Sequence, residues 1–306
     1  MSHDVIVCVH NGGKDVEACL QSLVRHWEPA RVRKLILVDD CSGPEMARFL
    51  AGFERAHGFV QRLRLEQQHY YTRAANAGLA QSDARLRTLL NSDTLVTPGW
   101  IGRIQDVFAL SPEIGIVGPL SNAASTQSVP FVKSSATQTA INDLPPGVTI
   151  DDFAAFIAQT GRDVPPPFTP LIHGFCMTIS TAVLDAIGMF DDELFPRGYG
   201  EENDFCFRAE NAGFILAVAV DTFIYHVKSV SYPSNEREAL MRDGMQKLAH
   251  RHGTPRIRMA VNYMERHPGL QAMRNAVVAA WPEVYRESPP LDPAPSPKFP
   301  KNVSSA

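Results

Sequence analysis

Acidic side chains cluster in the segment Gly200–Phe205 and just after it. Four carboxylates fall between positions 201 and 210: Glu201, Glu202, Asp204 and Glu210. Repulsion between neighbouring carboxylates raises their pKa values, which is how a protein makes a base that works near neutral pH. The alternative is that these acids begin a helix, where the helix dipole favours negative charge. The segment alone leaves both interpretations open.

Other polar side chains follow apolar runs that are typical of buried strands. His10 and Asn11 follow Asp4–Val9, Asp39 and Asp40 follow Leu35–Val38, and Asn91, Ser92 and Asp93 follow Leu86–Leu90. In α/β sheets, ligands bind at the carboxyl ends of the strands, so we expect these side chains to face one ligand. The alternative for Asp39 and Asp40 is an ordinary turn that leads into a helix.

Three side chains of the chain are suited to a metal ion or a phosphate, namely Asp93, His226 and Arg73. A carboxylate such as Asp93, fixed at a strand end beside a nucleotide diphosphate, is a natural ligand for Mg²⁺ or Mn²⁺. His226, also at the end of a predicted strand, would supply a second ligand, and the alternative is a hydrogen-bonded core histidine. The segment Thr72–Gly78 offers a helix N-terminus and the cation Arg73 for phosphate, against the alternative of a solvated arginine.

Short apolar runs alternate with amphipathic stretches through the first part of the chain, and this pattern predicts an α/β fold with a mostly parallel central sheet flanked by helices. We expect strands at Asp4–Val9, Leu35–Val38, Val60–Leu65, Leu86–Leu90, Ile114–Val117, Cys176–Ser180, Ile215–Val218 and Phe223–His226. We expect helices at Asp15–Arg25, Pro44–Ala56 with Ser42 as its N-cap, Thr72–Ala80, Pro98–Leu110, Asp151–Gln159 and Thr181–Ile187, from Glu201, and from Asn235 to Trp281.

Composition limits the classes of function. The chain has 306 residues, is 44% hydrophobic and carries a net charge of −4, which argues against general nucleic-acid binding because that needs a basic field. Its five scattered cysteines predict buried free thiols in a reducing compartment. No apolar run is long enough to span a bilayer. We therefore expect a cytoplasmic protein.

The ordered set of motifs resembles a large family of inverting glycosyltransferases with the GT-A fold, which includes bacterial rhamnosyltransferases and the cellulose and chitin synthases. The resemblance covers roughly Asp4 to Tyr232. It rests on Val5–Asn11 as the opening strand, Cys19–Leu23 in the first helix, Val38–Ser42 as the nucleoside-binding strand end, Leu90–Thr94 as the metal motif, and Gly188–Phe195 followed by Gly200–Phe205 as the acceptor and base region. The separation of Glu202 from His226 also suits the family.

The resemblance implies a role for each matching residue. Glu202 would be the catalytic base, with Asp204 as its alternative, and Asp93 and His226 would hold Mn²⁺ or Mg²⁺. The nucleotide would be bound by His10, Asn11, Asp39, Asp40, Arg73, Asn76 and Asn91, and the donor or acceptor sugar would be contacted by His173, Gly174 and Glu201. Asn91 departs from the family, which usually has Asp there, so it touches either the metal or only the ribose.

The expected organisation has three parts. Residues 1–232 form the GT-A domain, in which 121–170 is an insertion and a candidate acceptor lid; 233–287 form a helical C-terminal extension, and 288–306 a disordered proline-rich tail. The partners implied are a nucleotide-sugar donor (UDP or dTDP) and a saccharide or lipid-linked acceptor in surface polysaccharide assembly. Basic side chains outnumber acidic ones between Ser231 and Asn275, which indicates a solvated face or peripheral contact with the inner membrane face.

Other functions lack their motifs. A dinucleotide-binding dehydrogenase needs G-x-G-x-x-G after the first strand, and His10–Gly13 does not supply it. An α/β-hydrolase needs G-x-S-x-G, which is absent. The main alternative from another class is a non-catalytic nucleotide- or carbohydrate-binding relative of a glycosyltransferase.

Overall fold

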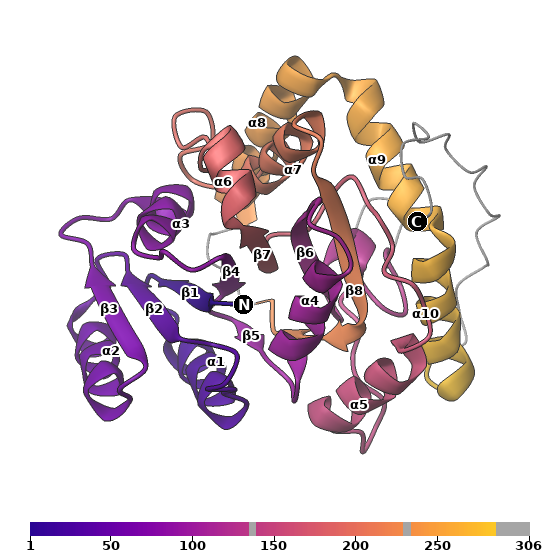
Figure 1. Ribbon diagram of the computed structural model, residues 1–306, viewed down its shortest axis with the longest axis horizontal. Helices are drawn as coiled ribbons and strands as arrows, with labels where there is room; N and C mark the ends of the chain where they lie inside the picture. Colours follow the sequence, from indigo (N-terminus) through magenta and orange to yellow (C-terminus); the bar gives the residue numbers. More distant parts are fainter. Residues whose placement is uncertain (135–138, 229–233, 286–306) are drawn as a thin grey trace.

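The computed structural model describes residues 1–134, 139–228 and 234–285. A mixed sheet of seven strands forms its centre, in the order β3-β2-β1-β4-β7-β6-β8 (Figure 1). The strands are β1 (His3–Val9), β2 (Lys34–Asp39), β3 (Val60–Arg64), β4 (Leu86–Asn91), β6 (Ile114–Leu120), β7 (Cys176–Ser180) and β8 (Ile215–Phe223). Only β7 runs antiparallel to its neighbours within this sheet, so the predicted mostly parallel sheet is confirmed.

Helices cover both faces of the sheet and build a hydrophobic core on each. One core contains α1 (Gly13–Arg25), α2 (Pro44–Ala56) and α4 (Trp100–Ala109). The other contains α3 (Tyr70–Ala80), α5 (Ile150–Gly161), α6 (Thr181–Ile187) and α7 (Glu201–Asn211). The strands between them are apolar on both sides, as Val5 and Ile6 show by their complete burial in opposite cores. Such runs are expected of strands that helices cover on both faces.

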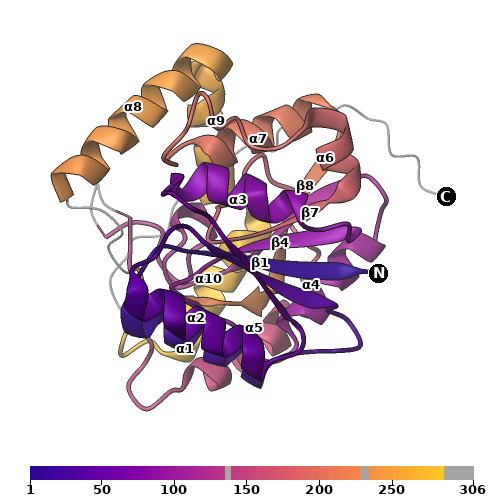
Figure 2. The same ribbon diagram turned by 90° about the vertical axis from the view of Figure 1, so that its left-hand side faces the viewer.

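The C-terminal extension packs on the second core as a chain of helices. It comprises α8 (Ser234–His252), α9 (Thr254–Arg266) and α10 (Pro268–Ala280), and Figure 2 shows α8 along the same side of the molecule as α3 and α7. Each of the three helices has a side chain buried in this core: Leu248 of α8, Met264 of α9 and Val277 of α10. The boundary predicted at 232 and the tail predicted at 288–306 lie outside the described residues.

Several basic side chains of this extension act inside the fold. Arg256 pairs with Glu210 at 2.5 Å, and Arg251 pairs with Asp191 and Asp204. The buried guanidinium of Arg274 donates hydrogen bonds to the backbone carbonyls of 126, 128 and 265, and burial lowers the pKa of Arg274 to about 10. Part of the excess positive charge of this segment therefore serves to form ion pairs and hydrogen bonds inside the fold.

The structure corrects three local expectations. Helix α2 begins at Pro44, so its N-cap is Gly43 and not Ser42; the Ser42 hydroxyl instead accepts a hydrogen bond from the Asn11 N–H at 3.0 Å. Helix α3 begins at Tyr70, before the predicted Thr72. Strand β8 continues to Phe223 because its pairing with β6, although irregular after Pro119, extends that far.

The remaining expectations about the chain concern its thiols and its apolar segments. All five cysteines are free, as predicted, but only Cys19, Cys176 and Cys206 are buried, whereas Cys8 and Cys41 are partly exposed. Within the described ranges, none of the helices is both long and apolar enough to cross a bilayer.

Candidate functional site

A two-stranded ribbon brings Asp93 and His226 together. Strand β5 (Thr94–Leu95) pairs antiparallel with β9 (Tyr225–His226), with Thr94 opposite His226. The Val227 N–H donates to the Asp93 carbonyl at 2.9 Å. This register places the Oδ1 atom of Asp93 3.2 Å from the Nε2 atom of His226. The two predicted metal ligands, far apart in sequence, are thus neighbours.

The start of the 121–170 segment fixes the ring of His226. Asn122 accepts a hydrogen bond from the His226 N–H at 2.7 Å and donates to its carbonyl at 3.1 Å. The Nδ1 atom lies 3.0 Å from the Ala123 carbonyl, so we assign the ring proton of a neutral His226 to Nδ1. The lone pair on Nε2 then faces the Asp93 carboxylate.

Two electron-rich atoms at this distance need a cation or a proton between them, so the pair fits a divalent metal ion. An imidazole nitrogen and a carboxylate oxygen suit Mn²⁺, and the oxygen also suits Mg²⁺. Among the described residues, no group of three or more His, Cys, Asp and Glu side chains is arranged to hold a metal ion. The protein would therefore supply two ligands and leave the other positions to phosphate oxygens and water.

Glu201 and Glu202 begin helix α7 in different environments. Glu201 is 4% exposed and its carboxylate accepts a hydrogen bond from the Gly200 N–H at 3.0 Å. Burial, followed by the charge of Glu202, raises the pKa of Glu201 well above its usual value. A hydrogen bond shared with the Glu202 side chain adds to this increase, which favours the protonated form of Glu201. Glu202 itself is only partly buried.

The segment Gly174–Phe175 connects Glu202 to the metal pair. A Cβ atom on Gly174 would lie 3.6–3.8 Å from the side chain of Glu202, so the carboxylate packs directly over this glycine. The ring of Phe175 stacks on that of His226, with centroids 5.7 Å apart. Lys228 lies within electrostatic reach of both Asp93 and Glu202. Glu202 and the Asp93–His226 pair thus flank one short stretch of backbone.

The carboxylate of Asp204 is engaged in ion pairs with other side chains, which does not fit its predicted role as an alternative base. It is completely buried, and its carboxylate pairs with Arg208 at 2.8 Å, Arg251 at 3.0 Å and His252 at 2.8 Å. Burial alone would raise the pKa of Asp204, but hydrogen bonds from Arg208 and His252 lower it below its ordinary value. Such a carboxylate is a weak proton acceptor. Because Arg251 and His252 belong to α8, the contacts of Asp204 instead join helices α7 and α8.

The strand ends of β1 and β2 form one hydrogen-bonded loop. The His10 ring lies 2.7 Å from the Asp40 carbonyl and 3.2 Å from the Asn11 amide, and Asn11 also accepts from the Gly43 N–H at 2.9 Å. Asp40 is 3% exposed and accepts from the His69 N–H at 2.7 Å. The residues predicted at this edge are therefore brought together.

Three further predicted nucleotide ligands have internal partners. Asp39 is fully buried and pairs with Arg64 at 2.6 Å and Arg62 at 3.3 Å. The Asn76 amide exchanges two hydrogen bonds with the Phe190 backbone. Arg73 lies 3.7 Å from Asp192. These contacts hold α3 to the 190–192 loop and β2 to β3, and Asn76 in particular fits a structural role better than a nucleotide contact.

His173 is also held by its own contacts. Its Nε2 atom lies 2.8 Å from the Thr126 hydroxyl, and its backbone N–H donates to the Gln127 side chain at 2.7 Å. Burial, and then the charge of Lys228, lowers the pKa of His173 to about 4, so this histidine is neutral at physiological pH. It anchors the Gly174 segment to the 3-10 turn Ser125–Gln127.

Sequence reasoning missed Tyr71 near the two glutamates. Burial raises the pKa of Tyr71 well above its usual value, and electrostatic interactions with Cys8, Glu201 and Glu202 add to this increase. Its phenol therefore lies close to the pair. The only signal in the sequence was an aromatic pair, Tyr70–Tyr71, at the start of a helix.

The family described as "Glycosyl transferase family 2" matches residues 4–187. None of the curated proteins matches the chain.

The chain is similar in fold to several solved structures. GalNAc-T7 with UDP, GalNAc and Mn²⁺ has a TM-score of 0.61 and 14% identity over 90% of this chain and 54% of that one. The mannosyltransferase PcManGT from Pyrobaculum calidifontis, in complex with GDP-Man and Mn²⁺, has a TM-score of 0.55 and 14% identity over 92% and 75%. TarS 1-349 from S. aureus, in complex with UDP-GlcNAc, has a TM-score of 0.51 and 12% identity over 99% and 98%. The chain spans about half the length of GalNAc-T7, and likeness at these identities shows the fold.

Proposed function

The chain belongs to glycosyl transferase family 2, and on this premise we propose that it is a metal-dependent, inverting glycosyltransferase. It moves a sugar from a nucleotide-diphosphate donor, a UDP- or dTDP-sugar, to a hydroxyl of a saccharide or glycolipid acceptor in surface polysaccharide assembly. One observation carries the proposal: Gly174 contacts Glu202 while the adjacent Phe175 stacks on His226, beside Asp93. A base on one side of this backbone segment and two metal ligands on the other suit a single transfer reaction.

In the proposed reaction, Glu202 accepts the proton of the acceptor hydroxyl while that oxygen attacks the anomeric carbon. The bond from this carbon to the diphosphate oxygen breaks at the same time, and its electron pair leaves with the diphosphate. Attack from the face opposite the leaving group inverts the anomeric centre, and no covalent sugar intermediate forms.

Asp93 and His226 would hold Mn²⁺ or Mg²⁺, which when bound acts as a Lewis acid toward the departing diphosphate. His10, Asn11, Asp40 and Asn91 are the proposed nucleotide contacts, since they lie at the ends of β1, β2 and β4. Glu201 stays protonated and donates to Glu202, which keeps that carboxylate oriented.

The neighbouring structures support the donor class. Their titles name UDP, GDP-Man and UDP-GlcNAc, and two of them name Mn²⁺. We infer the same kind of donor for this chain, bound by the GT-A domain predicted over residues 1–232, with the helical extension predicted over 233–287 packed behind the base.

A thermal-shift screen of nucleotides and nucleotide sugars, with and without Mn²⁺ and Mg²⁺, tests the proposal. A ligand at 100 times its dissociation constant stabilises the folded state by ~2.7 kcal/mol. We expect this for one nucleotide only with metal present, and we expect Asp93→Ala to lose it while the exposed control Asp163→Ala keeps it. No shift with any combination of nucleotide and metal ion, or an unchanged shift in Asp93→Ala, would contradict the proposed site. Binding without turnover would indicate a non-catalytic relative.

A further inference from the structure

Helix α8 touches the loop before the two glutamates at a glycine. A methyl group on Gly244 would overlap the carbonyl oxygen of Tyr199 and lie 3.5 Å from its Cβ atom. Gly244 stands in the middle of the 19-residue helix α8, where glycine costs about 0.5–1 kcal/mol relative to alanine. The close approach of helix and loop is the structural reason for a glycine at this position.

A second contact follows one turn later on the same face of α8. Leu248 is 1% exposed, and a Cβ atom on Gly200 would lie 3.2 Å from its Cδ1 atom. Gly200 is the N-cap of α7, with φ of 136°, and Tyr199 before it has φ of 64°. A non-glycine residue in this region costs about 1–3 kcal/mol and persists only where neighbours hold it. Helix α8 provides those neighbours.

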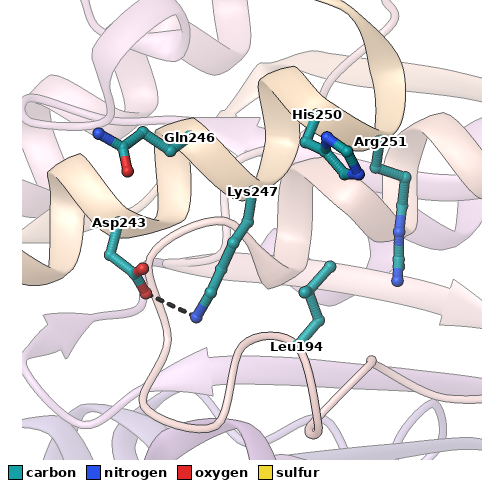
Figure 3. Close-up of a pocket in the computed structure, with 6 residues that line it drawn as sticks. All are labelled: Leu194, Asp243, Gln246, Lys247, His250 and Arg251. Carbon is teal, nitrogen blue, oxygen red and sulfur yellow. Dashed lines mark ion pairs between the residues drawn. The ribbon is translucent and has the colours of Figure 1, made fainter.

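Ion pairs extend this contact along α7 and the preceding loop. Arg251 pairs with Asp191 at 2.8 Å and with Asp204 at 3.0 Å, and His252 also reaches Asp204. Figure 3 shows Lys247 and Arg251 of α8 near Leu194 of the loop, where they line a cavity of about 290 Å³, with Lys247 paired to Asp243. Contacts from α8 therefore reach residues both before and after Glu201 and Glu202.

We propose that α8 is a positioning element of the reaction site, which holds the Glu202 carboxylate in place through Gly244, Leu248 and Arg251. This inference rests on the proposed function, because the contacts position a catalytic base only if Glu202 is that base. The side chain of Glu202 packs over Gly174, and Glu202 is the second residue of α7, so its position depends on the backbone at 199–202. A shift of that backbone moves the base while leaving Asp93 and His226, on β5 and β9, in place.

The substitution Gly244→Ala tests this proposal, with Gly52→Ala as its matched control. Gly52 also lies within a helix, α2, but a methyl group there meets only Arg55 at 3.9 Å. Hydrogen exchange of the free proteins, which needs no ligand, is expected to rise ~10-fold at amides of 198–206 in Gly244→Ala and to stay unchanged in Gly52→Ala. We expect kcat for hydrolysis of the nucleotide sugar selected in the thermal-shift screen to fall by ~10–100-fold, with the dissociation constant of its nucleoside diphosphate, measured with Mn²⁺ present, unchanged.

The variant Arg251→Gln gives an independent test, because it removes two ion pairs without adding volume. We expect it to change exchange and kcat in the same direction. Wild-type exchange at 198–206 and wild-type kcat in the folded variants would overturn the proposal, and so would an equal loss of kcat and of affinity for that nucleoside diphosphate. If the wild-type protein binds and hydrolyses no nucleotide sugar, the proposed function fails, whereas the exchange data still decide whether α8 holds this loop.

Discussion

Replacing Asp204 by Asn separates a structural carboxylate from a catalytic one. The side chain is completely buried between Arg208, Arg251 and His252. Removing one partner of a buried ion pair costs about 3–5 kcal/mol because the other charge is left uncompensated. Arg208 and Arg251 are 22% and 36% exposed, so water can solvate them after the change. We therefore expect the lower end, about 3 kcal/mol.

Chemical denaturation and thermal unfolding measure this loss, which corresponds to a fall in Tm of about 5 °C for a chain of this size. The matched comparison is Glu202→Gln, which should leave stability nearly unchanged and lower kcat by about 10²–10⁴. For folded Asp204→Asn we expect a fall in kcat smaller than the ~10² that a misplacement of 1 Å can cause. Wild-type stability together with a loss of rate as large as that of Glu202→Gln would refute the reasoning and make Asp204 the base.

The remaining predictions concern Glu201 and the metal pair. Because the folded-state pKa of Glu201 is raised, its contribution to stability is complete below the unfolded pKa of about 4.3 and is lost as pH rises toward the folded value, by ~1.4 kcal/mol per pH unit. Urea unfolding at several pH values should show this slope in wild type and not in Glu201→Gln; equal slopes would contradict a protonated Glu201. His226→Ala should abolish the Mn²⁺-dependent part of nucleotide binding in calorimetry, and unchanged metal dependence would remove His226 as a ligand. Asn91→Asp should strengthen Mn²⁺ binding if Asn91 touches the metal, and an unchanged metal affinity would leave it with the ribose.

The sequence predicted the strand ends of β1, β2 and β4 because buried apolar runs are bounded by polar residues there. The sequence placed Asp93 and His226 at strand ends, and the family resemblance supported them as a pair. The ribbon of β5 and β9 that joins them was not predicted, since no periodicity links two short strands so far apart. The neighbouring acids at 201–204 looked alike in sequence. The structure separates them because Arg251 and His252, from a distant helix, surround Asp204, while Glu202 faces Gly174.

Gly244 and Asn76 show what local sequence cannot reveal. A glycine inside a helical pattern predicts a weak helix, and only the packing of α8 on Tyr199 gives its cause. Asn76 was predicted to contact the nucleotide, but its amide exchanges hydrogen bonds with the Phe190 backbone. Both depend on which surfaces meet, and that is decided by the tertiary fold.

The anomeric configuration of the transferred sugar tests the central claim most directly. Proton NMR at early times would follow the wild-type protein with Mn²⁺ and the nucleotide sugar selected by the thermal-shift screen, with Glu202→Gln as the control. The account predicts a first product with the configuration opposite to that of the donor, formed only slowly by Glu202→Gln. A first product with the donor's own configuration, or equal rates in the two proteins, would contradict a single displacement in which Glu202 is the base.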